Sequence, residues 1–304
     1  MTTPVDPILL DLAACPACGG TLEVRACGEE LACRACGARY EVRGGIPVLL
    51  PPGFDRTRLA QEEHLGDLMT GLPEEAKDPL SEREWKRSKA EFWEFVRGRL
   101  APGGETIVSI GCGVDTAFLE LGARHTALAF DLVVPLLETL RDRHGSKLNV
   151  AGAVQSLPLK DGVFDALCCI DLLHHDPDRL EEIVRSFHRV LRPGGRLFLE
   201  DVNAWGLLQM WKSPLPRPLR AALRSLWHRL RSSRQRPAPY EFPTSVFRTG
   251  RLLAEAGFEE ITAVPQRAWP NTPRPALAAC RALSRIPRIR RYHNFHYFLY
   301  AVKR

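Results

Sequence analysis

Four cysteines near the N-terminus have the spacing of a metal site. They form two C-x-x-C pairs, Cys15 with Cys18 and Cys33 with Cys36, and each pair is followed by glycine. One such turn brings two thiolates to a metal, and two turns joined by a hairpin supply the four sulfurs of a tetrahedral zinc site. The alternative is a reduced pair of turns, but so small a segment has too little core to fold without a metal. We therefore predict zinc on these four thiols, with Cys27 left free.

A glycine turn and an acid further along the chain have the arrangement of a nucleotide site. Gly111-Cys112-Gly113 follows the β-branched apolar run Thr106–Ile110, and a helical pattern then leads to a second apolar run that ends on Asp131. Two glycines one residue apart give a tight turn and let the backbone approach a ligand. An acid at the end of the second strand accepts both hydroxyls of a ribose. The pattern predicts the first half of a nucleotide-binding βαβ unit.

Two adjacent histidines are the candidates for acid–base chemistry. The nearly continuous apolar run Phe164–Ile170 predicts a strand buried on both faces. Such a strand delivers Asp171, His174 and His175 to the carboxyl edge of the sheet, where ligands bind in open α/β proteins. Histidine is the natural base near neutral pH, so His174 or His175 could take a proton from a nucleophile. The alternative is that one of them only caps the loop or the next helix.

Length and composition allow one large domain with a small one beside it. The chain has 304 residues, of which 45% are hydrophobic and 26% charged, as in a globular protein. Pro51-Pro52-Gly53 is a boundary, so we predict a zinc ribbon at 1–52, a helical linker or cap at 53–103 and the main domain at 104–304. No run is long enough for a membrane span and no signal region begins the chain, so we expect a cytoplasmic protein.

Alternating strand and helix patterns predict a doubly wound α/β domain. A polar helical pattern at 58–71 and a second one at 80–100, which carries an aromatic stripe, precede that domain. The predicted strands are 106–110, 127–131, 148–151, 164–170, 196–200, 258–264 and 292–302, and the predicted helices begin at 117, 135, 180 and 244.

The ordered motifs resemble the class I S-adenosylmethionine (SAM) dependent methyltransferases, close to their ubiquinone/menaquinone-type small-molecule branch. The matching segments are 108–113, 156–166, 171–175 and 189–197. The resemblance implies a seven-stranded, Rossmann-like methyltransferase sheet with SAM as cofactor. The residues that it implies around SAM are Ser109, Gly111, Cys112, Gly113, Asp131, Leu132, Ala153, Val154 and Asp171.

Two positions depart from the family's pattern. Ala153 stands where relatives usually carry an acid that receives the adenine amino group, and Ser109 stands where an acid often precedes the glycine turn. Each missing polar contact could weaken SAM binding by about 1 kcal/mol. This keeps open a non-catalytic, SAM-binding regulator or scaffold.

The segment after the second cysteine pair carries a further resemblance. Tyr40–Leu50, with its Gly-Ile-Pro-Val-Leu run, is similar to the zinc-ribbon proteins that partner tRNA and protein methyltransferases. Ribbons also head some ribosomal RNA guanine methyltransferases, so an RNA substrate stays open. The alternative role for the ribbon is that of a packing or substrate-lid element.

A basic insert at 204–240 interrupts the main domain. Residues 204–239 carry eight Lys or Arg and no acid, and 219–231 predict a helix with a Leu/Trp face opposite an arginine face. Three roles are open: a lid over the substrate, contact with an anionic membrane, and contact with RNA phosphates. We predict a SAM-dependent methyltransferase acting on a small aromatic or lipid-like acceptor. An RNA methyltransferase is the second choice and a scaffold the third.

Overall fold

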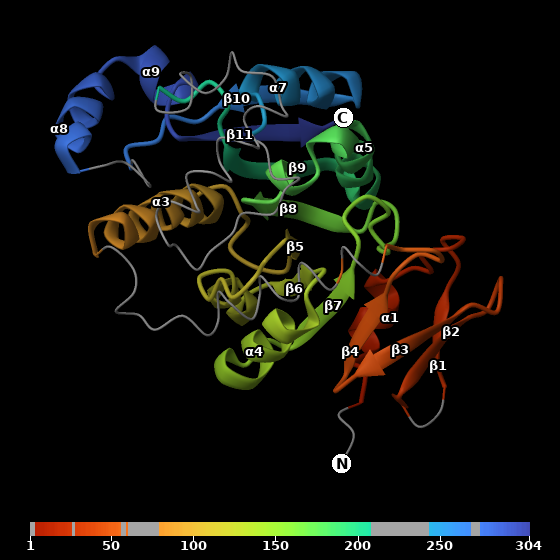
Figure 1. The fold of residues 1–304 in the computed structure, drawn as a ribbon. Coiled ribbons are helices and arrows are strands. Elements are labelled where there is room, and N and C mark those ends of the chain that lie inside the picture. Colours follow the sequence, from red (N-terminus) through yellow and green to blue (C-terminus); the bar gives the residue numbers. More distant parts are fainter. Residues whose placement is uncertain (1–3, 26–27, 56–58, 60–78, 208–242, 269–273) are drawn as a thin grey trace.

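A single mixed sheet runs through the whole molecule (Figure 1). The structure is a computed structural model that describes residues 4–25, 28–55, 59, 79–207, 243–268 and 274–304. Within these ranges eleven strands pair in the order β1-β2-β3-β4-β7-β6-β5-β8-β9-β11-β10. Cys27, the predicted helix at 219–231 and, apart from residue 59, the predicted helix at 58–71 lie outside the described residues.

The seven strands of the main domain confirm the predicted sheet. β7, β6, β5, β8 and β9 are parallel, and β11 lies antiparallel between β9 and β10. The parallel strands are almost fully buried, which is why they appear in the sequence as continuous apolar runs. Their bounds are β5 Thr106–Ile110, β6 Thr126–Asp131, β7 Leu148–Gly152, β8 Phe164–Ile170, β9 Leu191–Val202, β10 Phe258–Ala263 and β11 His296–Lys303.

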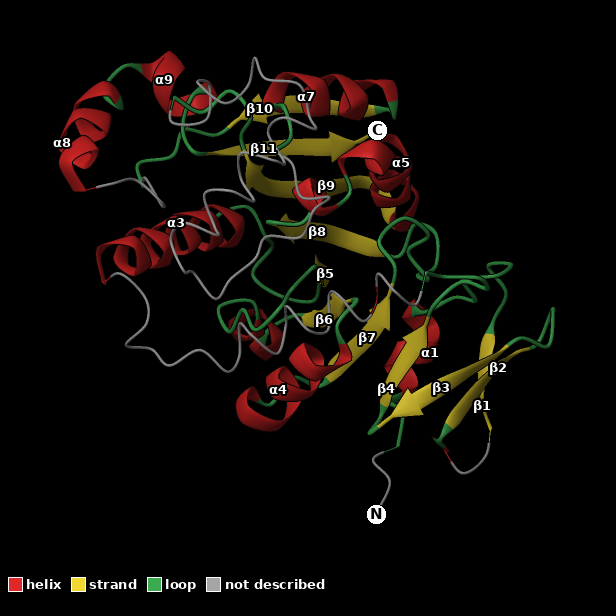
Figure 2. Ribbon diagram, viewed as in Figure 1, coloured by secondary structure: helices red, strands yellow, loops and turns green. Residues whose placement is uncertain are grey.

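Helices cover both faces of this sheet (Figure 2). One face packs on α5 (Leu180–Val190), α7 (Val246–Glu255) and the short α1 (Pro7–Leu12). The other face packs on α3 (Pro79–Arg97) and α4 (Val134–His144), with Phe92, Trp93 and Val96 of α3 fully buried. The aromatic stripe predicted in this helix is therefore core.

The sequence patterns and the structure differ at two elements. The helix expected from residue 117 forms only a 3₁₀ turn, Leu119–Ala123, because the segment between β5 and β6 must also make the glycine turn. The final strand begins at His296 and not at Tyr292, since Pro287 starts a short helix, α9 (Pro287–Tyr292), beside α8 (Arg274–Leu283). None of the helices within the described ranges is long and apolar enough to cross a bilayer.

The N-terminal module is joined to the main domain by strand pairing. Its strands are β1 (Leu22–Arg25), β2 (Glu30–Cys33), β3 (Arg39–Arg43) and β4 (Ile46–Leu49), and β1 and β2 form the predicted hairpin. β4 pairs in parallel with β7, with Val48 opposite Ala151. The sheet order within the main domain makes β7 its edge strand, so β4 covers an edge that would otherwise be open.

Candidate active site and metal centre

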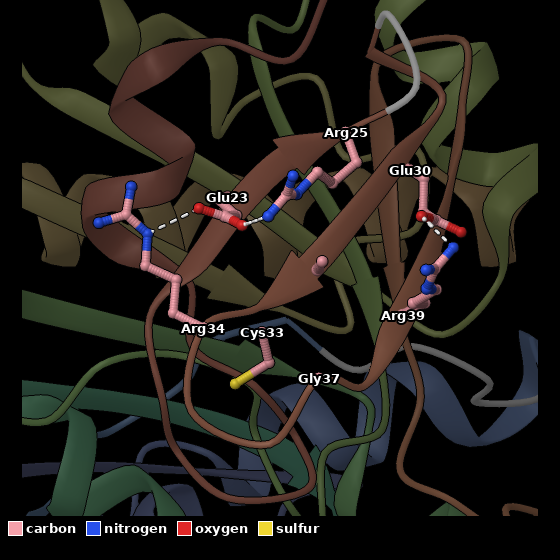
Figure 3. A pocket seen from close by; sticks show the side chains of 8 residues that line it. Glu23, Arg25, Glu30, Cys33, Arg34, Gly37 and Arg39 are labelled. Atoms are coloured by element: carbon pink, nitrogen blue, oxygen red, sulfur yellow. Dashed lines mark hydrogen bonds and ion pairs between the residues drawn. The ribbon is translucent and has the colours of Figure 1, made fainter.

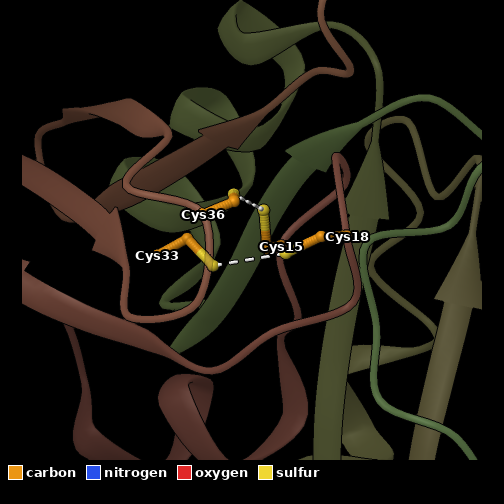
Figure 4. A group of neighbouring side chains, drawn as sticks. All are labelled: Cys15, Cys18, Cys33 and Cys36. Atoms are coloured by element: carbon orange, nitrogen blue, oxygen red, sulfur yellow. Dashed lines mark hydrogen bonds between the residues drawn. The ribbon is translucent and has the colours of Figure 1, made fainter.

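The four predicted metal-binding cysteines come together at one end of the β1–β2 hairpin (Figure 4). All four sulfurs lie within 4.8 Å of one another. Cys15 Sγ is 3.7 Å from Cys36 Sγ, and Cys18 Sγ is 3.5 Å from Cys33 Sγ. Four sulfurs at the usual zinc distance of about 2.3 Å stand about 3.8 Å apart in a tetrahedron. The cluster therefore fits zinc.

The local backbone explains why these turns need glycine and why the thiol of Cys33 loses its proton readily, whereas the neighbouring cysteines raise the pKa of Cys18 to about 12. Gly19 and Gly37, which follow the two pairs, have φ of 73° and 72°, a conformation that other residues rarely adopt. The backbone N–H of Cys36 is the largest cause that lowers the pKa of Cys33, to about 6. The thiolate is the form that binds metal.

The glycine turn and the ribose acid lie against each other at the carboxyl ends of β5 and β6. Gly111 and Gly113 have φ of 68° and 52°. Asp131, almost fully buried, accepts a hydrogen bond from Gly113 N at 2.8 Å and another from Val133 N at 2.9 Å. A Cβ added to Gly113 would meet nothing within 4 Å. Since a carboxylate accepts about four hydrogen bonds, this corner fits the ribose end of SAM.

The other residues implied around SAM occupy the same edge of the sheet. Leu132 and Ala153 follow the ends of β6 and β7, and Ala153 is buried, so only backbone is available there for an adenine contact. Cys112 is buried in the glycine turn, and burial raises its pKa well above its usual value. Ser109 lies inside β5 and is buried, and Val154 is partly buried in the loop after β7.

His174 is held by a buried carboxylate. Its Nδ1 lies 2.6 Å from Oδ1 of Asp201, which is fully buried at the end of β9. Thr244 donates to Oδ2 of Asp201 at 2.8 Å, and the hydroxyl of Tyr297 lies 2.7 Å from that of Thr244. The ring of His175 lies with its centroid 4.4 Å from that of His174. Asp201 is not among the predicted site residues, although its place at the carboxyl end of a strand was a usable signal.

A second polar cluster lies between α3 and the carboxyl ends of β8 and β9. Lys89 of α3 pairs with Asp171 at 2.7 Å, and Ser88 donates to Glu200 at 3.0 Å. His296 lies 3.2 Å from Asp171 and 3.6 Å from Glu200. Asp171 has a positive φ of 52°, a strained conformation of the kind that clusters at functional sites. Nothing in the local sequence around these residues predicts this contact.

The charges of this cluster shift the pKa values of its two acids in opposite directions. Burial would raise the pKa of Asp171, but Lys89 and His296 outweigh burial and hold it well below its usual range. Burial raises the pKa of Glu200. The ion pair between Lys89 and Asp171 therefore fixes α3 to the end of β8, beside the glycine turn.

Replacing Lys89 with methionine is expected to lower the free energy of unfolding by about 2 kcal/mol at pH 7, because Asp171 loses its charged partner in a largely buried place. Urea denaturation measures this. The matched control is Arg87→Met on the same helix, which removes an exposed i,i+4 pair with Glu91 and should cost less than about 0.5 kcal/mol.

The sign of the pH dependence follows from the low pKa of Asp171 in the folded chain. Its stabilising effect is present above the unfolded value of about 3.9 and is lost as the pH falls through the folded pKa. The difference in stability between the wild type and Lys89→Met should therefore narrow below about pH 4. Equal stabilities of the two proteins at pH 7 would contradict the ion pair.

A pocket of about 470 Å³ lies on the N-terminal module and not at the carboxyl edge of the main sheet (Figure 3). Its charged side chains are already paired: Glu23 with Arg25 and with Arg34, and Glu30 with Arg39. None of the residues implied around SAM lines this pocket.

Two families match separate parts of the chain. Residues 108–199 match the methyltransferase domain family Methyltransf_11, and residues 6–45 match the Trm112p-like proteins. The solved structure of the [4+2]-cyclase SpnF is similar with a TM-score of 0.53 at 18% identity, over 81% of this chain and 96% of that one. This likeness shows the fold.

The curated relatives include ubiquinone biosynthesis O-methyltransferases. That of Xanthomonas oryzae is 36% identical over 119 residues, which are 36% of this chain and 48% of that protein. That of Pseudomonas paraeruginosa is 29% identical over 144 residues, 41% of this chain and 60% of that protein. The chain spans about half the length of these relatives. Together the matches confirm the predicted resemblance: residues 108–199 carry a methyltransferase domain, and residues 6–45 carry a Trm112p-like module whose four clustered cysteines fit zinc.

Proposed function

We propose that this chain is an enzyme that transfers the methyl group of SAM to a hydroxyl of a small aromatic or lipid-like acceptor. The observation that carries the proposal is the contact of His174 with the buried Asp201 at the sheet edge that also holds Asp131. Cofactor corner and base thus share one edge, as methyl transfer requires.

The cofactor roles follow from the geometry of the glycine turn. Asp131 accepts the ribose hydroxyls, and Gly111 and Gly113 let the cofactor approach the backbone. Leu132, Ala153 and Val154 line the adenine end, where backbone groups take the place of the missing acid. Ser109 and Cys112 support the turn from within, and Asp171 bounds the far end of the site. Bound SAM supplies an electrophilic methyl group.

His174 is the base, and His175 packs against it. Asp201 accepts the Nδ1 proton of His174, which places the acceptor lone pair of the ring on Nε2, the atom that takes the proton of the acceptor hydroxyl. As the acceptor oxygen takes the methyl group that bound SAM would supply, its hydroxyl proton goes to Nε2 of His174. Asp201 stabilises the resulting imidazolium, and the products are a methyl ether and demethylated cofactor.

The acceptor class rests on the relatives' names and on the base. The curated relatives are named as O-methyltransferases of ubiquinone biosynthesis, which favours a phenolic hydroxyl on a ring with a lipid tail. SpnF is named as a cyclase although it shares this fold, so the fold alone does not determine the reaction. The Trm112p-like match keeps RNA as the second acceptor class. We place the protein in the cytoplasm, because the four thiols assigned to zinc must stay reduced and a reducing compartment keeps them so.

Two structural parts of the proposal come from the sequence. We keep the domain boundaries at residues 52 and 103, with 53–103 as a cap over the cofactor site. We also keep the basic insert at 204–239 as a lid with peripheral membrane contact, although residues 208–239 lie outside the described part of the chain.

Asp131→Ala is expected to weaken SAM binding by about 1.5–3 kcal/mol, or roughly 10- to 150-fold, because the ribose loses an acceptor for two hydroxyls. Calorimetric titration of SAM measures this. The control is Asp142→Ala, which removes an exposed acid of α4 and should leave the affinity unchanged. Equal SAM affinities of the wild type and Asp131→Ala would contradict the assignment of Asp131 to the cofactor site.

The reaction itself is tested with methyl-labelled SAM and two kinds of acceptor, catechol-type phenols with and without a prenyl tail, and total RNA. Label in the phenol supports the proposal. Label in RNA alone supports the second class. SAM binding without transfer to any acceptor would point to the scaffold role.

A further inference from the structure

One surface of the protein combines unpaired arginines with exposed apolar side chains. It is formed by α8, α9 and the chain segments that flank them in space. Its members, called the α8–α9 patch from here on, are Trp205, Phe247, Leu283, Arg285, Ile286, Arg288 and Arg291. Figure 1 shows α8 and α9 at the rim of the molecule, beyond α3 and the start of β11.

The charge of the patch has a single sign. Residues 274–292 hold six arginines and no acid, and no Asp or Glu follows Glu260. Arg281 is paired with Glu84 of α3. In the part of the chain that the structure describes, Arg285, Arg288 and Arg291 have no acidic partner, and all three are exposed. They therefore present a concentrated positive charge to the outside.

Apolar side chains are interleaved with these arginines. Leu283 is 39% exposed, Ile286 48%, Trp205 44% and Phe247 51%, and they are four of the seven large apolar residues exposed in the described ranges. Tyr292 at the end of α9 stacks on Phe247 with ring centroids 5.5 Å apart, and Phe247 lies 5.8 Å from Trp205. The aromatic members thus form one group, while Leu283 ends α8 and Ile286 directly precedes α9.

The patch borders the site at which the acceptor is methylated. Asn203, two residues beyond Asp201, donates to the carbonyl of Tyr292 at 2.7 Å, and His293 contacts the carbonyl of Trp205 at 3.0 Å. These bonds fix the patch to the carboxyl end of β9. An acceptor bound near His174 therefore lies next to this surface.

We propose that the α8–α9 patch docks the protein on an anionic lipid bilayer. Arginines attract acidic headgroups, and aromatic and aliphatic side chains enter the boundary between headgroups and acyl chains. Leu283 and Ile286 favour a membrane over RNA, because aliphatic side chains neither stack on bases nor bond to phosphates. The link between docking and catalysis rests on the proposed function: docking at this edge lets a lipid-tailed acceptor reach His174 without leaving the bilayer.

Co-sedimentation of the full chain with vesicles tests this without SAM or acceptor. We expect binding to vesicles of phosphatidylcholine with phosphatidylglycerol, and little binding to phosphatidylcholine alone. Arg285→Glu with Arg288→Glu should lower the partition coefficient at least about tenfold, since each surface arginine contributes on the order of fivefold. Ile286→Glu should lower it about tenfold through lost apolar burial.

Matched controls on the N-terminal module keep the test specific. Arg34→Glu with Arg39→Glu makes the same change in net charge, and Val24→Glu places a charge at an equally exposed apolar position. Both should bind vesicles as the wild type does. The SAM affinity of every variant is measured separately, so that a failed cofactor site is distinguished from a failed docking surface.

Three results would overturn the proposal. The first is a wild type that does not bind anionic vesicles. The second is equal loss of binding in the patch variants and in the module controls, which would show a net-charge effect. The third is salt-sensitive binding of RNA to the patch that added vesicles do not displace.

Discussion

Replacing His174 with glutamine is expected to lower kcat by about 10²- to 10⁴-fold, the range for loss of a positioned general base. Glutamine keeps a polar side chain near Asp201 but cannot accept the acceptor's proton. SAM affinity should stay within about threefold, because His174 serves the acceptor and not the ribose corner. Steady-state kinetics at saturating SAM, with calorimetry for the cofactor, measure both quantities.

His175→Gln is the matched control, because the two rings lie side by side and only His174 is held by Asp201. Its kcat should fall by less than about tenfold. Thr244→Val removes the hydroxyl that donates to Asp201 and should give an intermediate loss in kcat with an altered pH–rate profile. If His175→Gln is the damaging variant and His174→Gln is not, the assignment of the base is wrong.

Removing zinc is expected to have the largest effect on the folded state. Structural zinc contributes about 10–16 kcal/mol of apparent binding free energy at pH 7 in small zinc-dependent folds. Cys33→Ser, or a strong chelator, should therefore unfold the N-terminal module. Elemental analysis should give one zinc per wild-type chain and none in Cys33→Ser. Cys280→Ser should keep the metal, because Cys280 lies outside the four-sulfur cluster, and we predict the same for Cys27→Ser.

The loss of zinc should also reach the cofactor. Leu49 of β4 is buried and lies opposite Gly152, the last residue of β7, and Ala153 and Val154 follow directly. When β4 is lost, this loop is no longer held in place, and SAM affinity should fall by about tenfold or more. Full SAM affinity in the zinc-free protein would mean that the module and the cofactor site are independent.

Local patterns were sufficient to predict the parallel strands, because both faces of these strands are buried and most of their residues are apolar. The cysteine cluster could also be predicted from the sequence, because the spacing within two short turns is enough to bring the four ligands together. The glycine turn and Asp131 belong to one βαβ unit, so their contact also follows from nearby sequence.

The contacts that sequence could not predict join distant segments. Lys89 and Asp171 are separated by 82 positions, and a lysine on a polar helix gives no sign of its partner. The pairing of β4 with β7 depends on which edge of the finished sheet is open. The short helix α1 was overlooked, although Asp6 caps it and Pro7 begins it, because six residues are too few for a periodic pattern.

The pairing of β4 with β7 also sets an order of events during synthesis. Val48 and Ala151 are 103 positions apart, so at about 5–20 residues per second the ribbon emerges roughly 5–20 s before its partner strand. Within that interval the ribbon can bind its metal and fold, so that β4 is already formed when β7 emerges and pairs with it. A cell short of zinc would instead release chains whose β7 edge is uncovered and ready to pair with other chains. Metal supply during translation would then decide how much of this protein reaches its folded state and how much aggregates.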